Sequence, residues 1–441
     1  MTFCAGLAGC ACPSSNCGVP GTPCAPCANE LVVVEDDLPD LTEPFECQCE
    51  LIPLPTPTET FQLLDASTCQ CNAATNAPIA NMVELERHWA KVTIECDTKN
   101  VRKNLCMDRD LLALHVADHR NSAAASALEA FYQLAGLEAQ KRYLRLGIDE
   151  AHQTLGRVDK LLDKGLAVPE GVDRTTVATR LQELEDQQLQ LDFSRIQLNG
   201  QLQKLIGCPL DEYSFYWPQM GWQPDLTPVD VEGALAQGLS TRPDLRGLSL
   251  VLCNLEKVTL TVARGILKFA DSTIGTVEPR DGVLHTLRCF RCNSHEVPVR
   301  CRQLAIFYQH TEQGAIAEIK NAAYKISLQQ QRVVLAQQKV QRLQERLYEL
   351  TETRDVNDVS IFELSNLRGR IYEAQSDLIQ KVAALKIADV ELLKSQGMLA
   401  VECGYAPVLC LEGCCDGACS KSAGCRCSCR ACKKQSCSRC K

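Results

Sequence analysis

Apolar residues recur at alternating intervals of three and four residues along four stretches of the chain. The four rows start at Leu134, Val177, Ile319 and Leu364, and 31 of their 36 positions are apolar. At the chain's apolar content of 45%, about sixteen would be expected by chance. This spacing is the heptad pattern of coiled coils, in which helices pack along a narrow apolar seam. Each row covers 28 residue steps, which predicts helices at least ~42 Å long.

The rows are separated by signals that end helices, and they are arranged as a duplication. Pro169 and Gly171 separate the first row from the second, and Gly207 ends the second. Rows one and three start 185 residues apart, and rows two and four 187. The pattern predicts an all-α fold of two tandem long antiparallel coiled-coil hairpins, with bends at 163–176 and 348–363. Cys-rich irregular tails flank the hairpins.

These breaks predict five regions along the chain. The first is rich in Cys and Pro, and we expect it to be largely extended or disordered because it shows little periodicity. Two hairpin repeats follow, separated by a linker, and the second repeat contains an irregular insert. A basic, Cys-rich tail ends the sequence. The regions are 1–80, 82–207, 208–228, 229–400 with its insert at about 268–302, and 401–441.

Composition narrows the classes of function. Aromatic residues make up only 5% of the chain, whereas compact enzyme cores bury more aromatic bulk. The formal net charge of −9 provides no basic footprint for nucleic acid. No nucleophile–base pair, phosphate-binding glycine loop or carboxylate pair stands in a usable context, so we expect no enzyme. No apolar run of about eighteen residues occurs, so the sequence predicts no transmembrane helix.

The chain has 28 cysteines, concentrated at its two ends. Twelve precede residue 107, eleven lie from Cys403 onward, and the helical middle holds five. Such ends form disulfides in an oxidising compartment or a thiolate metal store in a reducing one. In the tail, alternating cysteines among seven Lys or Arg residues are typical of metallothionein-like clusters, or of a disulfide-linked anchor for an anionic wall or lipid surface. These tail cysteines are Cys425, Cys427, Cys429, Cys432, Cys437 and Cys440.

Two further patterns are candidate sites. Cys289, Cys292, His295 and Cys301 have a spacing compatible with a tetrahedral zinc site, and zinc is the only cofactor that the sequence suggests. The alternative is a loop, closed by a disulfide or carrying thiols, that caps a helical break. Leu-Ala-Gly-Cys at residues 7–10 resembles a lipoprotein processing box, in which Cys10 would carry the lipid. The alternative is a chance match in a tail rich in Cys, Gly and Ala.

Three segments resemble the TolC-like outer-membrane efflux family. GALAQGLSTRPDLRGLSL (233–250), centred on Arg242-Pro243-Asp244-Leu245, is similar to the segment that opens the family's second repeat. Segments 161–184 and 359–374 look like the two hairpin tips, and the resemblance covers about residues 105–400. In that family three protomers build a periplasmic tunnel of helices. The resemblance therefore implies a homotrimer in the cell envelope, at the outer membrane or in the periplasm, with an inner-membrane transporter or adaptor at the tips.

The chain departs from the family where the family crosses the outer membrane. The resemblance implies two membrane-crossing strands within each repeat, but the first repeat runs from Asp110 into its first row without a gap. The second repeat is interrupted only at 268–302, and neither repeat shows apolar–polar alternation over about ten residues. These strands are missing or degenerate in this sequence. We therefore expect a peripheral or lipid-anchored helical protein.

Two main functions follow from these patterns. The first is a passive efflux component, a periplasmic helical conduit or adaptor. The second is a structural coiled-coil scaffold that is cross-linked or anchored to the envelope through its Cys-rich ends; metal buffering by those ends is a third possibility. Lys141, Arg195 and Lys381 interrupt three of the apolar rows. They would either line a tunnel or fix the register of the helices.

Overall fold

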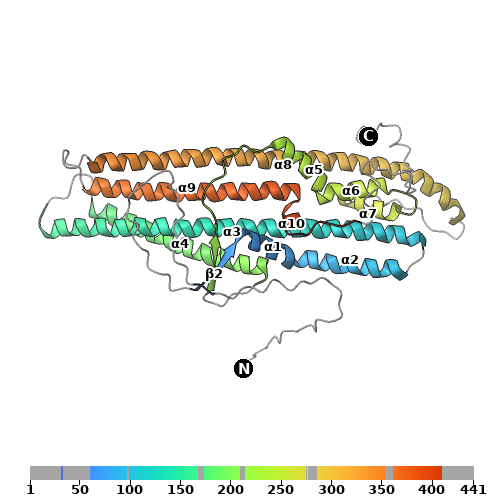
Figure 1. Ribbon diagram of the computed structural model, residues 1–441, viewed down its shortest axis with the longest axis horizontal. Coiled ribbons are helices and arrows are strands. Elements are labelled where there is room, and N and C mark those ends of the chain that lie inside the picture. The colour runs from blue at the N-terminus through green and yellow to red at the C-terminus, as the bar shows by residue number, and fades with distance from the viewer. Residues whose placement is uncertain are drawn as a thin grey trace, which may run out of the picture.

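Long helices dominate the computed structural model, which describes residues 31–32, 60–96, 99–166, 173–208, 214–274, 276, 286–352 and 361–409 (Figure 1). Helix α3 (Lys99–Asp163) has 65 residues and α8 (Thr286–Glu352) has 67. Each is therefore roughly 100 Å long at 1.5 Å per residue. Helices α4 (Arg174–Ile206) and α9 (Ile361–Gln396) are about half as long.

The four long helices lie side by side in the order α4, α3, α9, α8 (Figure 1). The pairs α3/α4 and α8/α9 are the two predicted antiparallel hairpins, which confirms the all-α fold class. Both bends lie at the same end of the molecule, called here the tip end, and both fall within the predicted intervals, because α3 ends at Asp163 and α8 at Glu352. The opposite end, where α3 and α8 begin, is called the base end.

The predicted apolar rows form the cores of the hairpins. Val333 of α8 is buried against Leu378 of α9 in the second hairpin, and Ile148 of α3 packs against Leu181 of α4 in the first. The hairpins are joined by a contact that the rows did not predict, in which α3 packs along α9. Across the described residues, no helix is both long enough and apolar enough to cross a membrane.

Short helices repeat at a second, constant offset. Helices α1 (Ala66–Asn76) and α2 (Pro78–Cys96) open the first repeat, and α5 (Val231–Thr241) and α6 (Pro243–Cys253) open the second, each start 165 residues later. The first helix of each pair begins alike, because an aspartate at its N-cap accepts a hydrogen bond from a backbone N–H. Asp65 accepts from Thr68 at 2.9 Å and Asp230 from Gly233 at 3.0 Å.

The structure differs from the expected region boundaries in three places. Residues 60–80 were expected to be extended or disordered, but they form a strand, α1 and the start of α2, so the first repeat begins before residue 82. The expected linker 208–228 contains a strand. The expected insert 268–302 is shorter, because α7 (Leu260–Ala270) precedes it and α8 is already helical at Thr286. A short helix, α10 (Leu399–Glu402), follows α9.

A three-stranded sheet lies against α3 and α4. Its order is β1 (Leu31–Val32), β2 (Thr60–Asp65), β3 (Ser214–Gln219), with β1 antiparallel and β3 parallel to β2. Arg195 of α4 lies over the rings of Phe61 and Phe215, 4.9 and 4.5 Å from their centres. Asn199 accepts a 2.7 Å hydrogen bond from the backbone N–H of Tyr216. These contacts attach the sheet to the first hairpin.

Candidate functional site

The first tip is shaped by local capping. Gly165 has a φ of +66°, and its N–H donates to Leu162 while the N–H of Leu166 donates to Leu161, which ends α3 in a left-handed turn. Arg174, the first residue of α4, returns to Asp159 of α3 with a nitrogen–oxygen distance of 2.7 Å. The bend predicted from Gly and Pro therefore carries an ion pair between its two helices.

Polar side chains join the two hairpins near the tips. Glu150 of α3, itself buried, accepts a hydrogen bond from Ser365 of α9, and the hydroxyls of Thr154 and Ser365 are 2.8 Å apart. Arg157 and Arg368 approach the same carboxylate to 3.9 and 3.8 Å. This contact belongs to neither predicted hairpin. No apolar row signals it, because its members are polar residues 211 to 215 positions apart.

A groove of about 660 Å³ runs beside this polar contact, between α3, α4 and α9. Gly147 and Leu144 of α3 lie along it, with Val177 of α4 and Tyr372 of α9. An ion pair between Arg180 of α4 and a glutamate of α9 spans it. The tip half of the molecule therefore presents a partly apolar groove that an ion pair between α4 and α9 crosses.

The charged residues that interrupt the rows are all paired within the chain. Arg195 meets Glu138 at 2.6 Å, and the buried amine of Lys141 pairs with Asp192, so both link α3 to α4. Lys381 pairs with Asp377 one turn earlier on α9, at 2.9 Å. Because two of the three pairs cross between helices, they fix the register of the first hairpin.

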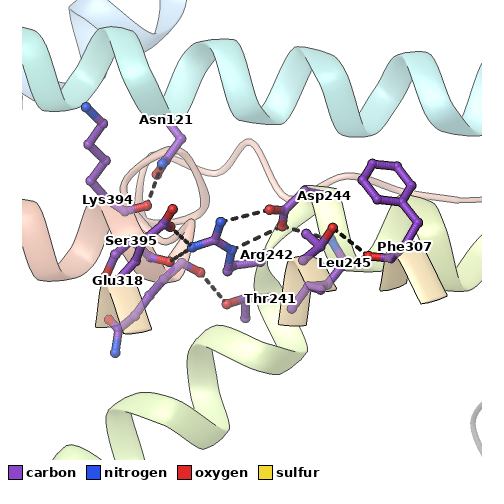
Figure 2. Close-up of polar contacts among 11 residues, drawn as sticks. Asn121, Thr241, Arg242, Asp244, Leu245, Phe307, Glu318, Lys394 and Ser395 are labelled. Atoms are coloured by element: carbon purple, nitrogen blue, oxygen red, sulfur yellow. Dashed lines mark hydrogen bonds and ion pairs between the residues drawn. The ribbon is translucent and has the colours of Figure 1, made fainter. Parts of the chain in front are cut away.

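The Arg-Pro-Asp-Leu segment predicted from the resemblance stabilises the end of α9. The last four carbonyls of a helix lack partners within it, and here each finds one. Leu393 accepts from the N–H of Met398 and Lys394 from that of Gly397. Three side chains from other elements complete the end of the helix, as Figure 2 shows. Asn121 donates to Lys394 at 3.0 Å, Arg242 to Ser395 at 3.1 Å and Thr241 to Gln396 at 2.6 Å.

Carboxylates hold the Arg242 guanidinium in place. It donates to Asp244 at 2.8 and 3.1 Å and to Glu318 of α8 at 2.6 Å. Burial alone would lower the pKa of Arg242, but these hydrogen bonds raise it above the ordinary arginine value. The segment thus connects the α5–α6 junction, α8 and the end of α9 (Figure 2). Its hydrogen bonds and ion pairs hold these three elements together.

The first repeat contains an equivalent joint that the sequence did not reveal. Asn76, at the end of α1, donates to the carbonyls of Lys204 and Leu205 at 3.3 and 3.2 Å, near the end of α4. Gly207 follows with a φ of +75°. In both repeats the junction between the first two helices therefore completes the last turn of the hairpin's second long helix. Asn76 lies in the region expected to be disordered, where no periodic pattern indicated a helix.

A C-terminal segment, residues 397–409, lies across α1 and α3. A disulfide joins Cys71 of α1 to Cys403, with 5.2 Å between their Cα atoms. The hydroxyls of Thr75 and Tyr405 are 2.7 Å apart, and Arg120 lies 4.0 Å above the ring of Tyr405. Cys208 and Cys253 each take part in a disulfide as well. At least part of the cysteine content thus forms disulfides.

The proposed zinc ligands lie on one helix and not in a loop. Helix α8 carries all four candidates, Cys289, Cys292, His295 and Cys301. The zinc site itself stays a prediction. Among the described residues, no group of three or more Cys, His, Asp or Glu side chains could hold a metal.

The remaining predicted sites lie outside the described residues. These are the lipid-anchor candidate Cys10 and the tail cysteines Cys425, Cys427, Cys429, Cys432, Cys437 and Cys440.

Comparison with known proteins gives the architecture a precedent. No family model matches the sequence, and no curated protein matches it. Among solved structures, a membrane protein from Pseudomonas aeruginosa superposes with a TM-score of 0.56 at 12% identity, over 75% of this chain and 93% of that one. CusC gives 0.55 at 12% identity, over 75% and 91%. The outer-membrane channel OprN gives 0.50 at 17% identity, over 68% and 72%.

The chain has a TolC-like fold. At these identities the likeness concerns the fold alone, and it agrees with the resemblance stated from the duplicated rows and the Arg-Pro-Asp-Leu segment.

Proposed function

We propose that this protein is a cell-envelope efflux component, a TolC-like helical conduit or adaptor assembled from several copies of the chain. The observation that carries the proposal is a pair of exposed apolar rows on the two edge helices of the layer.

One row lies on α4 and the other on α8. Leu189, Phe193 and Ile196 recur at spacings of four and three on α4, and Leu189 is 69% exposed. Leu328 and Leu335 lie seven residues apart on α8, and Leu335 is 65% exposed. Heptad spacing of this kind is a coiled-coil seam. Apolar rows left exposed along two helices mark surfaces for association.

The two rows are on opposite edges of the layer, which determines the kind of assembly. If the α4 edge of one copy packs against the α8 edge of the next, the contact is head-to-tail, and head-to-tail contacts close into rings when the rotation permits. A ring of such layers encloses a channel walled by helices. The family resemblance suggests three copies.

The proposed role is passive. An inner-membrane transporter or adaptor at the tip end would supply the energy for transport. The groove between α3, α4 and α9 offers this partner a binding surface. The proposed location is the cell envelope, at the outer membrane or in the periplasm. The disulfide between Cys71 and Cys403 supports this location, because disulfides persist in oxidising compartments.

The test uses one blocking substitution on each edge, Phe193→Glu on α4 and Leu335→Glu on α8. Light scattering should find a closed oligomer for the native chain and a monomer for each variant. Mixed together, the two variants retain one intact pair of edges, so they should form a dimer and nothing larger. Association of the native chain that neither substitution disturbs would contradict the proposal.

A second candidate function is a structural scaffold cross-linked through its Cys-rich ends, and the disulfide between Cys71 and Cys403 supports it only in that cysteines near the ends of the chain form disulfides. The same light-scattering experiment with and without reductant separates the two. A conduit ring persists under reduction, whereas a scaffold appears as a disulfide-linked ladder that collapses to monomers.

A further inference from the structure

A disulfide connects the ends of α4 and α9, the second long helices of the two hairpins. The C-terminal segment that follows α9 carries Cys403, which is bonded to Cys71 of α1. At the end of the same helix α1, Asn76 donates hydrogen bonds to two carbonyls in the last turn of α4. A path therefore runs from the end of α9 through the disulfide and α1 to the end of α4.

This path is short, and its two halves are packed against each other. Cys403 lies seven residues after the last residue of α9, and Asn76 lies five residues after Cys71 in one helix. Leu399 of α10 is fully buried in the same apolar cluster as Ala74 of α1. Packed side chains and rigid elements carry coupling between distant parts of a protein, so a movement at one helix end is transmitted to the other.

The disulfide is placed where a reductant can reach it and where it can re-form. Cys71 and Cys403 are both half-buried. Cys69, two residues earlier on α1, is fully buried and donates a hydrogen bond to the carbonyl of Ala127 at 3.5 Å. Residues two apart do not face each other on a helix. After reduction, Cys71 therefore faces Cys403 and not Cys69, so the same bond can form again.

Hydrogen bonds keep the C-terminal segment beside α1 when the disulfide is open. Gln70 donates to the carbonyl of Leu399 and to the carboxylate of Glu402, both at 2.9 Å. The hydroxyls of Thr75 and Tyr405 are 2.7 Å apart. These bonds lie in partly exposed positions, where water competes for the same groups. They can break and re-form, whereas the disulfide holds the two elements permanently.

We propose that the Cys71–Cys403 disulfide is a redox latch that couples the motions of α4 and α9. In the oxidised chain, one body made of α1, α10 and the C-terminal segment holds the ends of both helices. In the reduced chain the fold persists, but each helix moves about its own end. The inference concerns regulation of the proposed conduit, and it rests on the proposed function only for the meaning of a movement at the tips.

Opening the latch is a thiol–disulfide exchange with a dithiol. One thiolate of the dithiol attacks a sulfur of the bond and forms a mixed disulfide, and its second thiol then displaces that sulfur. The dithiol is oxidised to its own disulfide. Two electrons and two protons pass to the protein, which is left with thiols at Cys71 and Cys403.

The consequence of the movement is largest at the tip end. Helices α4 and α9 both begin there and end near the latch (Figure 1), and each is about 50 Å long at 1.5 Å per residue. A rotation of about 5° at the latch therefore displaces the start of a helix by about 4 Å. Near the tips, the ion pair between Arg180 and Glu373 joins the two helices through exposed side chains, and exposed ion pairs resist such a movement only weakly.

Hydrogen exchange of the full chain, read by mass spectrometry, tests the coupling. Asn76→Ala disconnects α4 from α1. In the oxidised chain this substitution should accelerate amide exchange in residues 397–405 by roughly fivefold or more, the usual lower range for coupled sites. In the Cys71→Ser, Cys403→Ser variant, and in the native chain after dithiol treatment, the acceleration should be confined to α1 and the end of α4.

The reverse perturbation should give the same answer, because coupling between two sites is reciprocal. Thr241→Ala removes the hydrogen bond to Gln396 at the end of α9. It should accelerate exchange at the end of α4 only while the latch is oxidised. Cys69→Ala is the matched control, and it should leave both the coupling and the reversible oxidation unchanged.

Pulsed electron paramagnetic resonance tests the movement at the tips. Thr175 on α4 and Glu363 on α9 are both exposed, and spin labels on non-natural amino acids at these two positions leave the cysteines untouched. The distance distribution should broaden by about 4 Å on reduction. A reductant also acts on the disulfides of Cys208 and Cys253. In the double serine variant, the reductant should therefore cause no further broadening.

Three results would overturn the proposal. The first is propagation from Asn76 to residues 397–405 that is equal in the oxidised and reduced chains, which would assign the coupling to packing alone. The second is a distance distribution that does not respond to reduction. The third is a disulfide that a dithiol cannot reduce in the folded chain. If the double serine variant does not fold, the native chain reduced in its folded state supplies the same comparison.

This inference and the proposed function fail separately. The coupling belongs to a single chain, so hydrogen exchange measures it equally well in a ring and in a monomer. A monomer with intact coupling would contradict only the proposed function. A ring in which the coupling is absent would contradict only the latch.

Discussion

Replacing Gly207 by alanine should destabilise the protein far more than the same change at Gly165. Both glycines end a long helix with positive φ, +75° at Gly207 and +66° at Gly165. An alanine in this left-handed conformation costs about 1–2 kcal/mol at either site. The sites differ in what a new Cβ would meet. At Gly165 nothing lies within 4 Å, whereas at Gly207 the Cγ of Asn76 would be 2.3 Å away.

Asn76 must therefore move, and it would lose its hydrogen bonds to the carbonyls of Lys204 and Leu205. Each such bond contributes about 1 kcal/mol. Gly207→Ala should lower the free energy of unfolding by about 3 kcal/mol, and Gly165→Ala by about 1 kcal/mol. Urea unfolding followed by far-UV circular dichroism measures both.

Asn76→Ala tests the reasoning independently. It removes the same two hydrogen bonds and the clash, so Gly207→Ala made in its background should cost little more than Gly165→Ala does. The double-mutant cycle should give a coupling of about 1–2 kcal/mol between residues 76 and 207. Equal losses for the two glycine variants, or a coupling near zero, would refute the idea that the α1–α2 junction holds the end of α4.

Two further predictions concern covalent and charge effects. Because the Cys71–Cys403 disulfide closes a loop of 332 residues, Cys71→Ser with Cys403→Ser should lower the free energy of unfolding by about 2–5 kcal/mol; a native chain whose urea midpoint does not respond to reductant would contradict this. Burial raises the pKa of Asp389 from 3.8 to about 6, so ionisation of this carboxyl lowers the free energy of unfolding. This destabilisation is absent below pH 4, grows between pH 4 and 6, and is complete above pH 6. Asp389→Asn should raise the free energy of unfolding at pH 7 by about 1 kcal/mol, allowing for the partial exposure of the carboxyl. This gain should vanish at pH 4. An equal gain at pH 4 and pH 7 would show that the carboxyl titrates normally.

The long helices could be predicted because apolar residues recur along them at regular intervals of three and four residues. Rows starting at Leu134 and Ile319 recur every three or four residues, and this period is enough to identify a coiled-coil helix without any partner. The bends could be predicted for a similar reason, since Gly and Pro end helices through their own backbone preferences. Both signals are confined to neighbouring residues, and the fold class follows from them.

The remaining contacts depend on partners far apart in the sequence. Strands β2 and β3 pair although about 150 residues separate them, and the joint between Asn76 and Leu205 spans 129. A polar residue such as Asn76 gives no periodic signal. The spacing of Cys289 and Cys292 is ambiguous in another way, because a three-residue interval suits a metal-binding turn and one turn of helix equally well. Here the chain is helical.

The disulfide between the first helix and the C-terminal segment also has a consequence for how the protein is made. Cys71 leaves the ribosome 332 residues before Cys403, so during synthesis and export it must wait for a partner that does not yet exist. Its neighbour Cys69 is a poor alternative in the folded helix, because burial and the charge of Asp65 raise the pKa of that thiol and so suppress its reactive thiolate. Once α1 has packed, the raised pKa of Cys69 favours Cys71 as the partner of Cys403. Oxidation of this pair cannot precede the synthesis of Cys403, so a pulse-labelled chain trapped with an alkylating reagent should show this bond only once residue 403 has been made.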